Sequence, residues 1–197
     1  MAHKLNAGEF DKIVKELSNQ YHVYAPRLLE GWGIFSDADI VGYGLVQSAG
    51  EIVFDKKSMY SFKETILPIS QTLFYFTDDT MKEPKPTYEK AVVFLRNCDK
   101  HGLKRLDDIY RADGKLDFYY EQLRSSTKFI VMGCDSGFDN CFCESMGTNV
   151  INDYDAYVTQ KGEDYILDSR FDELTEILKA QKAYEFEFPP PQYHQQD

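Results

Sequence analysis

Two uninterrupted apolar runs constrain the fold of this 197-residue chain more than any other feature. Lys90 to Leu95 and Lys128 to Met132 each resemble a strand buried on both faces, because neither shows the alternation of a half-exposed strand. Between them, Lys100 to Arg111 carries a helical apolar pattern, and Phe118 to Arg124 predicts a second short helix. A strand–helix–strand unit of this kind predicts a right-handed parallel pair of strands.

The flanking segments predict further helices and hairpins. Apolar residues at i, i+3, i+4 and i+7 predict a helix over Glu9 to Gln20, with Asn6 as its N-cap. A hairpin is expected to join Ala156–Gln160 to Asp164–Leu167, and an amphipathic helix to follow over Phe171–Ala180. Short extended or β-branched stretches punctuated by Gly, Asp or Pro are expected at Tyr21–Ala25, Gly31–Ile34, Val41–Gln47, Glu51–Phe54 and Thr72–Phe76.

These elements predict an α/β (or α+β) fold. We expect a mixed sheet with a parallel strand–helix–strand core, helices packed on it and antiparallel hairpins at its margins. Residues 1–188 are expected to form a single domain. The polar, proline-bearing segment 189–197, which contains Pro189-Pro190-Pro191, is expected to be a flexible tail.

The charge balance excludes one broad class of partner. The chain has 22 Lys and Arg against 33 Asp and Glu, a net charge of −11, and no basic cluster that could follow a phosphate backbone. We therefore expect no nucleic-acid binding. No apolar run approaches the roughly 18 residues of a membrane helix, and Met1 to Glu9 lacks an apolar signal segment. We expect a cytoplasmic protein with no membrane contact, in which cysteines are free thiols or metal ligands.

The four cysteines of the chain follow the two apolar runs. Cys98 comes shortly after the first run, and Cys134 shortly after the second. Parallel strands end at the same edge of a sheet, so both thiols are expected there, where open α/β sheets place their ligands. Cys141 and Cys143 lie in the same polar, glycine-bearing segment as Cys134. All four thiols are therefore expected to reach one point.

Four thiolates around one centre suit either an iron–sulfur cluster or structural Zn²⁺. The spacing matches neither the paired Cys-x₂₋₄-Cys knuckles of zinc sites nor the Cys-x₂-Cys-x₂-Cys run of ferredoxins. Free cysteines also often only fill a core, although a polar segment is a poor place for that role. A thiol redox enzyme is a further alternative, but Cys141-Phe-Cys143 is not a thioredoxin-like Cys-x-x-Cys pair. The residues alone leave these alternatives open.

Three segments carry a resemblance to a known family. They are Leu67-Pro-Ile-Ser-Gln-Thr-Leu-Phe-Tyr-Phe76, Arg96-Asn-Cys-Asp99 with Leu106-Asp107, and Asp139-Asn-Cys-Phe-Cys-Glu-Ser-Met-Gly-Thr148. They resemble the iron–sulfur electron-transfer subunit of anaerobic sulfite reductase, and are similar to the related β subunits of cytoplasmic sulfhydrogenases. The Cys-Phe-Cys-x-Ser-Met-Gly-Thr segment is the most specific part of the resemblance, which extends from the first predicted helix to about Phe188.

The resemblance implies an electron-transfer subunit that is not catalytic alone. Its partners would be a flavin subunit that oxidises NAD(P)H and a sirohaem subunit that reduces sulfite. It implies that Cys98, Cys134, Cys141 and Cys143 ligate one [4Fe–4S] cluster in an N-terminal cluster-binding domain, from which the cluster can be lost on isolation. Family members continue with two ferredoxin-type modules, and this sequence ends at Asp197, where they would begin. The alternative function is a structural docking scaffold with Zn²⁺ or no metal at the four cysteines.

Three polar residues beside the cysteines have expected local roles. Asp99 and Asp135 each follow a candidate ligand directly and are expected to cap a following turn or helix. If they act on the cluster instead, they would tune its charge. His101 is expected to be an exposed residue near the start of a helix.

Overall fold

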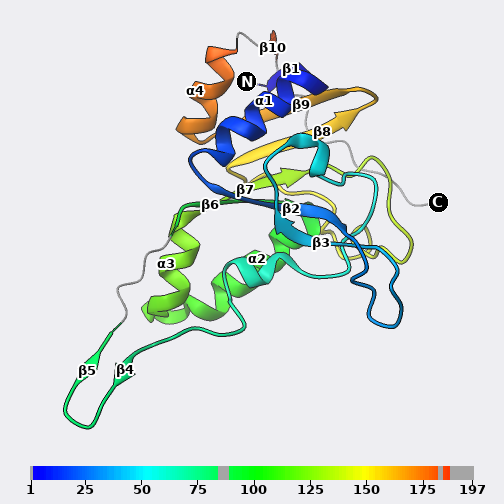
Figure 1. The fold of residues 1–197 in the computed structure, drawn as a ribbon. Helices are drawn as coiled ribbons and strands as arrows, with labels where there is room; N and C mark the ends of the chain where they lie inside the picture. Colours follow the sequence, from blue (N-terminus) through cyan, green and yellow to red (C-terminus); the bar gives the residue numbers. More distant parts are fainter. Residues whose placement is uncertain (1, 84–88, 182–183, 187–197) are drawn as a thin grey trace.

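The computed structural model describes residues 2–83, 89–181 and 184–186, in which an eight-stranded sheet of order β10-β1-β9-β8-β7-β6-β2-β3 dominates (Figure 1). Its strands are β1 (Ala2–Asn6), β2 (His22–Leu29), β3 (Ile40–Leu45), β6 (Ala91–Arg96), β7 (Thr127–Met132), β8 (Ala156–Lys161), β9 (Asp164–Ser169) and β10 (Tyr184–Phe186). The α-helices are α1 (Ala7–Ser18), α2 (Asn97–Tyr110), α3 (Phe118–Ser126) and α4 (Asp172–Ala180). The shorter elements are the 3₁₀ turns η1 (Ala49–Glu51), η2 (Phe62–Thr65) and η3 (Ala112–Gly114) and the strands β4 (Tyr75–Phe76) and β5 (Met81–Lys82).

The centre of the sheet is parallel, as the two apolar runs predict. β6 and β7 pair in parallel from Ala91 opposite Thr127 to Arg96 opposite Met132. β2 and β8 extend this parallel group on its two sides. The outer pairs are antiparallel, including the predicted hairpin of β8 and β9. The expectation of a mixed α/β sheet with a parallel core and antiparallel margins is therefore confirmed.

Both faces of the central strands are covered by helices, which explains why their sequences do not alternate. α1 and α4 lie on one face, and α2 and α3 lie on the other (Figure 1). Side chains of β6 and β7 alternate between the two resulting cores. Those facing α1 and α4 are Val92, Phe94, Ile130 and Met132. Those facing α2 and α3 are Val93, Leu95, Phe129 and Val131.

The first helix forms as its sequence predicts. Asn6 Oδ1 accepts a hydrogen bond from the Glu9 backbone N–H, and Glu9 Oε2 accepts one from the Asn6 N–H. This reciprocal capping box satisfies two donors that a helix start leaves free. The apolar stripe of α1 is fully buried against the sheet.

Two expected strands are wrong, and turn chemistry explains both. Gly31–Ile34 is part of a loop in which Gly31 has φ +69° and the Gly33 N–H donates to the Ala38 carbonyl. Glu51–Phe54 is not a strand either. The Glu51 carboxylate accepts from the backbone N–H of Ser48 and its hydroxyl, which winds the chain into η1 instead.

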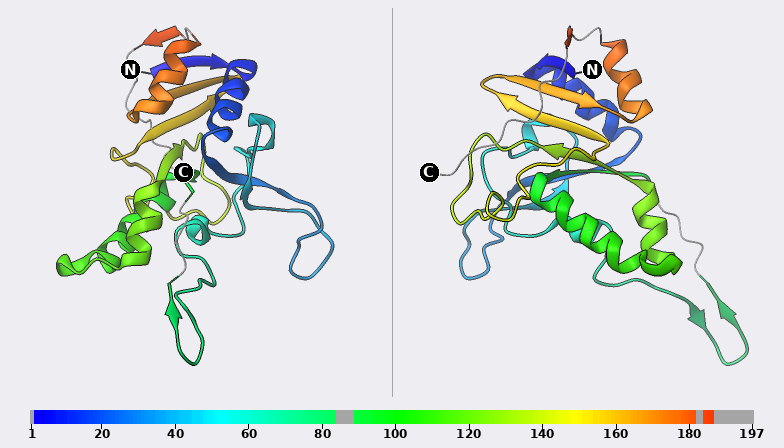
Figure 2. Two further views of the ribbon diagram at one scale, coloured as in Figure 1. Left: turned by 60° about the vertical axis from the view of Figure 1, so that its left-hand side comes forward. Right: turned by 180° about the vertical axis from the view of Figure 1, so that it is seen from behind.

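Two other expectations hold in part. β2 continues through Pro26 to Leu29, whereas the sequence predicts an end at that proline. β6 pairs only with His22–Tyr24 of β2. Proline has no backbone N–H, and it is tolerated at position 26 because the β6 side of β2 is unpaired there. Of the expected strand Thr72–Phe76, only Tyr75–Phe76 forms a strand, β4, which pairs with β5 in antiparallel fashion. The two form an arm that projects from the rest of the molecule (Figure 2).

At one edge the sheet ends in two strands, β1 and β10, that the sequence does not predict. β1 lies between β9 and β10 and pairs with both in antiparallel fashion. β10 begins at Tyr184, which pairs with Lys4 of β1. The expected flexible tail, 189–197, lies outside the described residues. Across the described ranges, no helix combines the length and apolar character needed to cross a membrane.

Candidate metal centre

The carboxyl ends of β6 and β7 bring two of the candidate ligands to one edge of the sheet. Arg96 and Met132, the last residues of the two strands, lie directly opposite each other. Cys98 and Cys134 each follow two residues later. Their common position at this edge follows from the parallel register that the sequence predicts.

Cys98 is held by a helix, whereas the sequence places it in a connection before one. α2 begins at Asn97 with no intervening loop, so Cys98 lies in its first turn. Asp99 Oδ2 accepts a hydrogen bond of 3.3 Å from the Arg96 backbone N–H, which confirms the expected capping role of Asp99. Cys98 therefore sits at the helix end whose free N–H groups carry partial positive charge.

Cys141 and Cys143 lie in a segment that folds into consecutive turns. The Cys141 N–H donates to the Phe138 carbonyl, and the Thr148 N–H donates to the Cys143 carbonyl at 2.7 Å. The last turn requires Gly147, whose φ is +62°, a conformation that side chains with a Cβ rarely adopt. Gly147 therefore lets the chain turn back directly after the two cysteines.

The four thiols are close enough to affect one another electrostatically. Desolvation of the thiol group raises the pKa of Cys98 to about 12, although the residue as a whole is exposed, and the charges of Asp99, Cys134 and Cys143 act in the same direction. Burial also raises the pKa of Cys134, with Cys143 and Cys141 adding to the effect. Each of the four cysteines thus interacts with at least one other.

These thiols do not form a finished ligand set. All four cysteines are free, with Cys98 exposed and the other three partly buried. Within the described residues, no three Cys, His, Asp or Glu side chains are arranged so that they could hold a metal ion. Convergence of four sulfurs on one centre therefore stays a prediction.

The donor set nevertheless fits a metal–sulfur group better than a packed core. Soft thiolates are the ligands that iron–sulfur clusters and Zn²⁺ take, and burial raises the cost of leaving them charged and unpaired. Mutual repulsion among neighbouring thiolates adds to that cost, as the raised pKa values of Cys98 and Cys134 show. A bound cation or cluster would remove it.

Arg96 also belongs to this site, although no sequence pattern predicts a role for its side chain. Its guanidinium Nη1 lies 3.8 Å from the Cys134 sulfur and 3.3 Å from the Gly133 carbonyl. The side chain is buried, with 7% exposure. The signal that could have revealed it is a charged residue at the end of an otherwise fully apolar buried strand.

The other polar neighbours differ from expectation. Asp135 forms an ion pair of 2.6 Å with Lys161 on β8 and caps no helix. His101 is partly buried, and its Nε2 lies 2.6 Å from the Val150 carbonyl oxygen. This contact ties α2 to the chain that follows the Cys141–Cys143 turns.

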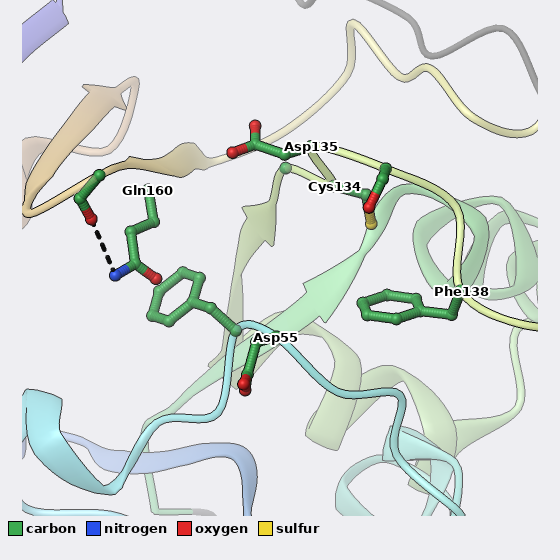
Figure 3. Close-up of a pocket in the computed structure, with 9 residues that line it drawn as sticks. Asp55, Cys134, Asp135, Phe138 and Gln160 are labelled. Carbon is green, nitrogen blue, oxygen red and sulfur yellow. Dashed lines mark hydrogen bonds between the residues drawn. The ribbon is translucent and has the colours of Figure 1, made fainter.

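A pocket of about 270 Å³ opens beside Cys134 (Figure 3). Cys134 and Phe138 lie on one side of it, with Gln160 on the other and Asp55 on the facing loop. The pocket gives solvent-sized molecules a path to the neighbourhood of this thiol.

Comparison with known proteins gives one informative match. The chain is 30% identical over 195 residues to sulfhydrogenase 2 subunit beta of Pyrococcus furiosus. The alignment covers 88% of this chain and 54% of that protein, so the chain spans about half the length of the curated relative it matches. No family model and no solved structure matches. The chain is therefore a distant homologue of a sulfhydrogenase β subunit.

Proposed function

We propose that this chain is the cluster-binding part of an electron-transfer subunit in a cytoplasmic multi-subunit oxidoreductase. The observation that carries the proposal is the placement of Cys98 and Cys134 at the carboxyl edge of the parallel strands, with Cys141 and Cys143 in the turns that follow Cys134. Homology to a protein named as a sulfhydrogenase subunit supports it. The four cysteines would hold a [4Fe–4S] cluster, which would accept and release single electrons.

Each part of the chain then has a defined task. α2 fixes Cys98, because a residue in the first turn of a helix inherits the rigidity of that helix. The sheet fixes Cys134, since the Gly133 N–H donates to the Val158 carbonyl on β8 at 2.8 Å. The turns of residues 138–148 carry Cys141 and Cys143 and can close on the other two. We infer that this closure accompanies metal binding.

The finer proposal concerns the assembly. We propose that the subunit relays electrons from a flavin subunit that oxidises NAD(P)H to a sirohaem subunit that reduces sulfite. On this proposal the partner subunits carry the flavin and the sirohaem, and the chain does not catalyse the reaction alone. The three segments resemble the electron-transfer subunit of anaerobic sulfite reductase and are also similar to sulfhydrogenase β subunits, so the partners recovered with the chain decide between the two assemblies.

The cluster can be tested directly on the purified chain. Reconstitution with iron and sulfide under anaerobic conditions should give brown protein with about four iron and four sulfide per chain. Replacing Cys98, Cys134, Cys141 or Cys143 singly by Ser should lower the iron content strongly, because serine is a harder ligand than thiolate. Ser145→Ala, in the same turns, is the matched control and should bind iron normally.

Two results would contradict the cluster. Colourless protein with one zinc per chain would establish the structural scaffold instead. Serine variants that keep the full iron content would show that the cysteines are not its ligands.

The assembly needs its own test, which is purification of the tagged chain from anaerobic cells. Recovery with flavin and sirohaem subunits supports the finer proposal, and recovery with hydrogenase subunits contradicts it.

A further inference from the structure

Arg96 links two loops at the candidate site. Its Nη1 donates to the Gly133 carbonyl and contacts the Cys134 sulfur, while its Nη2 donates to the Phe54 carbonyl at 2.5 Å and lies 3.4 Å from that of Lys56. The segment 54–56 and the start of the Cys134 loop are thus held together by one planar group. A guanidinium suits this geometry because its N–H donors form a rigid fork.

The charge of Arg96 is less well compensated than that of other arginines. Arg111 and Arg124 both form ion pairs with carboxylates, at 2.7 Å to Glu121 and 3.0 Å to Asp107 respectively. Within the described ranges, no carboxylate forms an ion pair within 4.0 Å of the buried Arg96 guanidinium, and the neighbouring Asp99 carboxylate interacts with its charge at longer range. A buried cation of this kind gains from any anionic group placed against it.

The Arg96 guanidinium lies next to the segment that carries three of the thiols. The guanidinium packs over the Phe138 ring, with its carbon 5.1 Å from the ring centroid, and Phe138 precedes the Cys141–Cys143 turns. Burial raises the pKa of Cys134, whereas the positive charge of Arg96 lowers it. The positive charge, one thiol and the chain leading to two others therefore lie together.

We propose that Arg96 is a positioning residue that clasps the Cys134 loop to segment 54–56 and provides the counter-charge of the thiolate-ligated cluster. The second role rests on the proposed function, whereas the clasp does not. If the four cysteines hold the cluster, its reduction by one electron, supplied by dithionite through a redox mediator, would add one negative charge beside Arg96 without breaking a bond. The guanidinium therefore stabilises the reduced state and raises the reduction potential.

Two substitutions separate the roles. Arg96→Lys keeps the positive charge, but a single ammonium cannot span the carbonyls of both loops. Arg96→Gln removes the charge and most of the donors. Arg111→Gln is the matched control, because it removes a partly buried arginine near the other end of α2.

Hydrogen exchange of the metal-free chain tests the clasp. The backbone N–H groups of Gly133 and Val53 are hydrogen-bonded to the Val158 and Pro26 carbonyls, so their exchange reports opening of the two loops. Both Arg96 variants should speed exchange there by about tenfold or more, since hydrogen bonds from charged groups are lost. Amides in the centre of β7 should not change, which separates a local effect from global unfolding. The Arg111 variant should match the wild-type chain at both loops.

Spectroelectrochemical titration of the reconstituted protein tests the counter-charge. Arg96→Gln should lower the reduction potential, while Arg96→Lys should restore most of it and Arg111→Gln should leave it unchanged. Exchange and potential that both match the wild type in Arg96→Gln would overturn the inference while the cluster itself stands. If the wild-type chain takes up no cluster, the proposed function fails and the counter-charge with it. Loop exchange then decides whether the clasp is correct.

Discussion

At the scale of single residues, Gly133 shows how closely the backbone approaches the sheet beside Cys134. A Cβ at this position would lie 2.9 Å from the Tyr157 hydroxyl oxygen and 3.0 Å from the Thr159 Cβ. The second contact is the more serious, because a β-carbon cannot move without its backbone. Any larger residue must push the Cys134 loop away from β8.

Gly133→Ala should therefore disturb both stability and the candidate site. We expect a loss of about 1–3 kcal/mol in the free energy of unfolding, as for other overpacked positions, and reduced iron content after reconstitution. Urea denaturation and iron analysis measure the two effects. Gly102→Ala is the control, since a Cβ there meets nothing within 4 Å in the middle of α2. It should be neutral or stabilising, and an equal loss in both variants would contradict the argument.

The sequence predicts the site unevenly at this scale. The edge shared by Cys98 and Cys134 follows from the two apolar runs and the helix between them, which predict a parallel pair of strands from a short stretch of sequence. Arg96 does not, because its partners Phe54 and Gly133 come from distant parts of the chain. The partial burial of His101 is not predictable for the same reason, since its contact with Val150 depends on how a later loop returns to α2.

At the scale of elements, α2 and α3 are joined by a charged network. The Tyr120 hydroxyl donates to Asp107 Oδ1 at 2.8 Å, and Arg124 Nε donates to the same carboxylate at 3.0 Å. Burial and this hydrogen bond raise the pKa of Tyr120 well above its usual value. The network fixes the packing of the two helices against β7, and so the direction in which α2 presents Cys98.

Tyr120→Phe should destabilise the chain by about 1–2 kcal/mol, because a partly buried carboxylate loses one of its hydrogen bonds. Chemical denaturation measures the change. The neighbouring Tyr119 is the control, since its partial burial involves a ring contact with Phe118 and no hydrogen bond from its hydroxyl to a described residue. Tyr119→Phe should change stability by less than about 0.5 kcal/mol. Similar losses in both variants would assign the effect to ring packing.

The start of α4 gives a prediction about pH. The backbone N–H of Glu173 and the Tyr21 hydroxyl, 2.9 Å away, hold the pKa of the Glu173 carboxyl below its usual value. A depressed pKa stabilises the fold above the unfolded-state value of about 4.3, and that contribution disappears as the pH falls through the folded-state value.

Glu173→Gln should therefore lose stability at neutral pH and show a shallower decline in acid than the wild type. Thermal unfolding between about pH 6 and pH 3 measures the difference. Glu176→Gln, on the same helix but exposed and without a hydrogen bond to a described residue, should leave the wild-type pH profile unchanged. Parallel profiles for wild type and Glu173→Gln would show that the carboxyl is not responsible.

Helices and strands were predictable from the sequence where the pattern of apolar residues alone determines them. α1, α2, α3, α4, β6 and β7 all form close to their expected positions, because an apolar stripe or a continuous apolar run marks each. The segments Gly31–Ile34 and Glu51–Phe54 fail because a glycine with positive φ and a carboxylate cap outweigh weak β propensity. β1 and β10 are too short to carry a pattern of their own.

At the scale of the whole molecule, β1 completes the sheet on the side away from β3. It lies between β9 and β10, and its Leu5 is fully buried against α1 and α4. Lys4 points outward and pairs with Asp164 at 2.7 Å. The strand therefore contributes one core side chain and one exposed ion pair at adjacent positions.

Leu5→Ala should cost about 2–5 kcal/mol in the free energy of unfolding, as large-to-small changes in a core do. Lys4→Ala should cost no more than about 1 kcal/mol, because exposed ion pairs contribute little. Equilibrium denaturation of the two variants compares them. A Leu5→Ala variant as stable as Lys4→Ala would mean that β1 is not anchored in the sheet.

The position of β1 also determines when the molecule can finish folding. Asn6 pairs with Asp164, and Lys4 pairs with Tyr184, so β1 leaves the ribosome long before its partners exist. At typical rates of synthesis it waits for roughly ten seconds or more. During that time its backbone donors and acceptors are open to any strand that passes, including one from a neighbouring nascent chain. Chaperone dependence of the newly made protein should therefore fall when synthesis is slowed only after β9 has emerged, and not when it is slowed before.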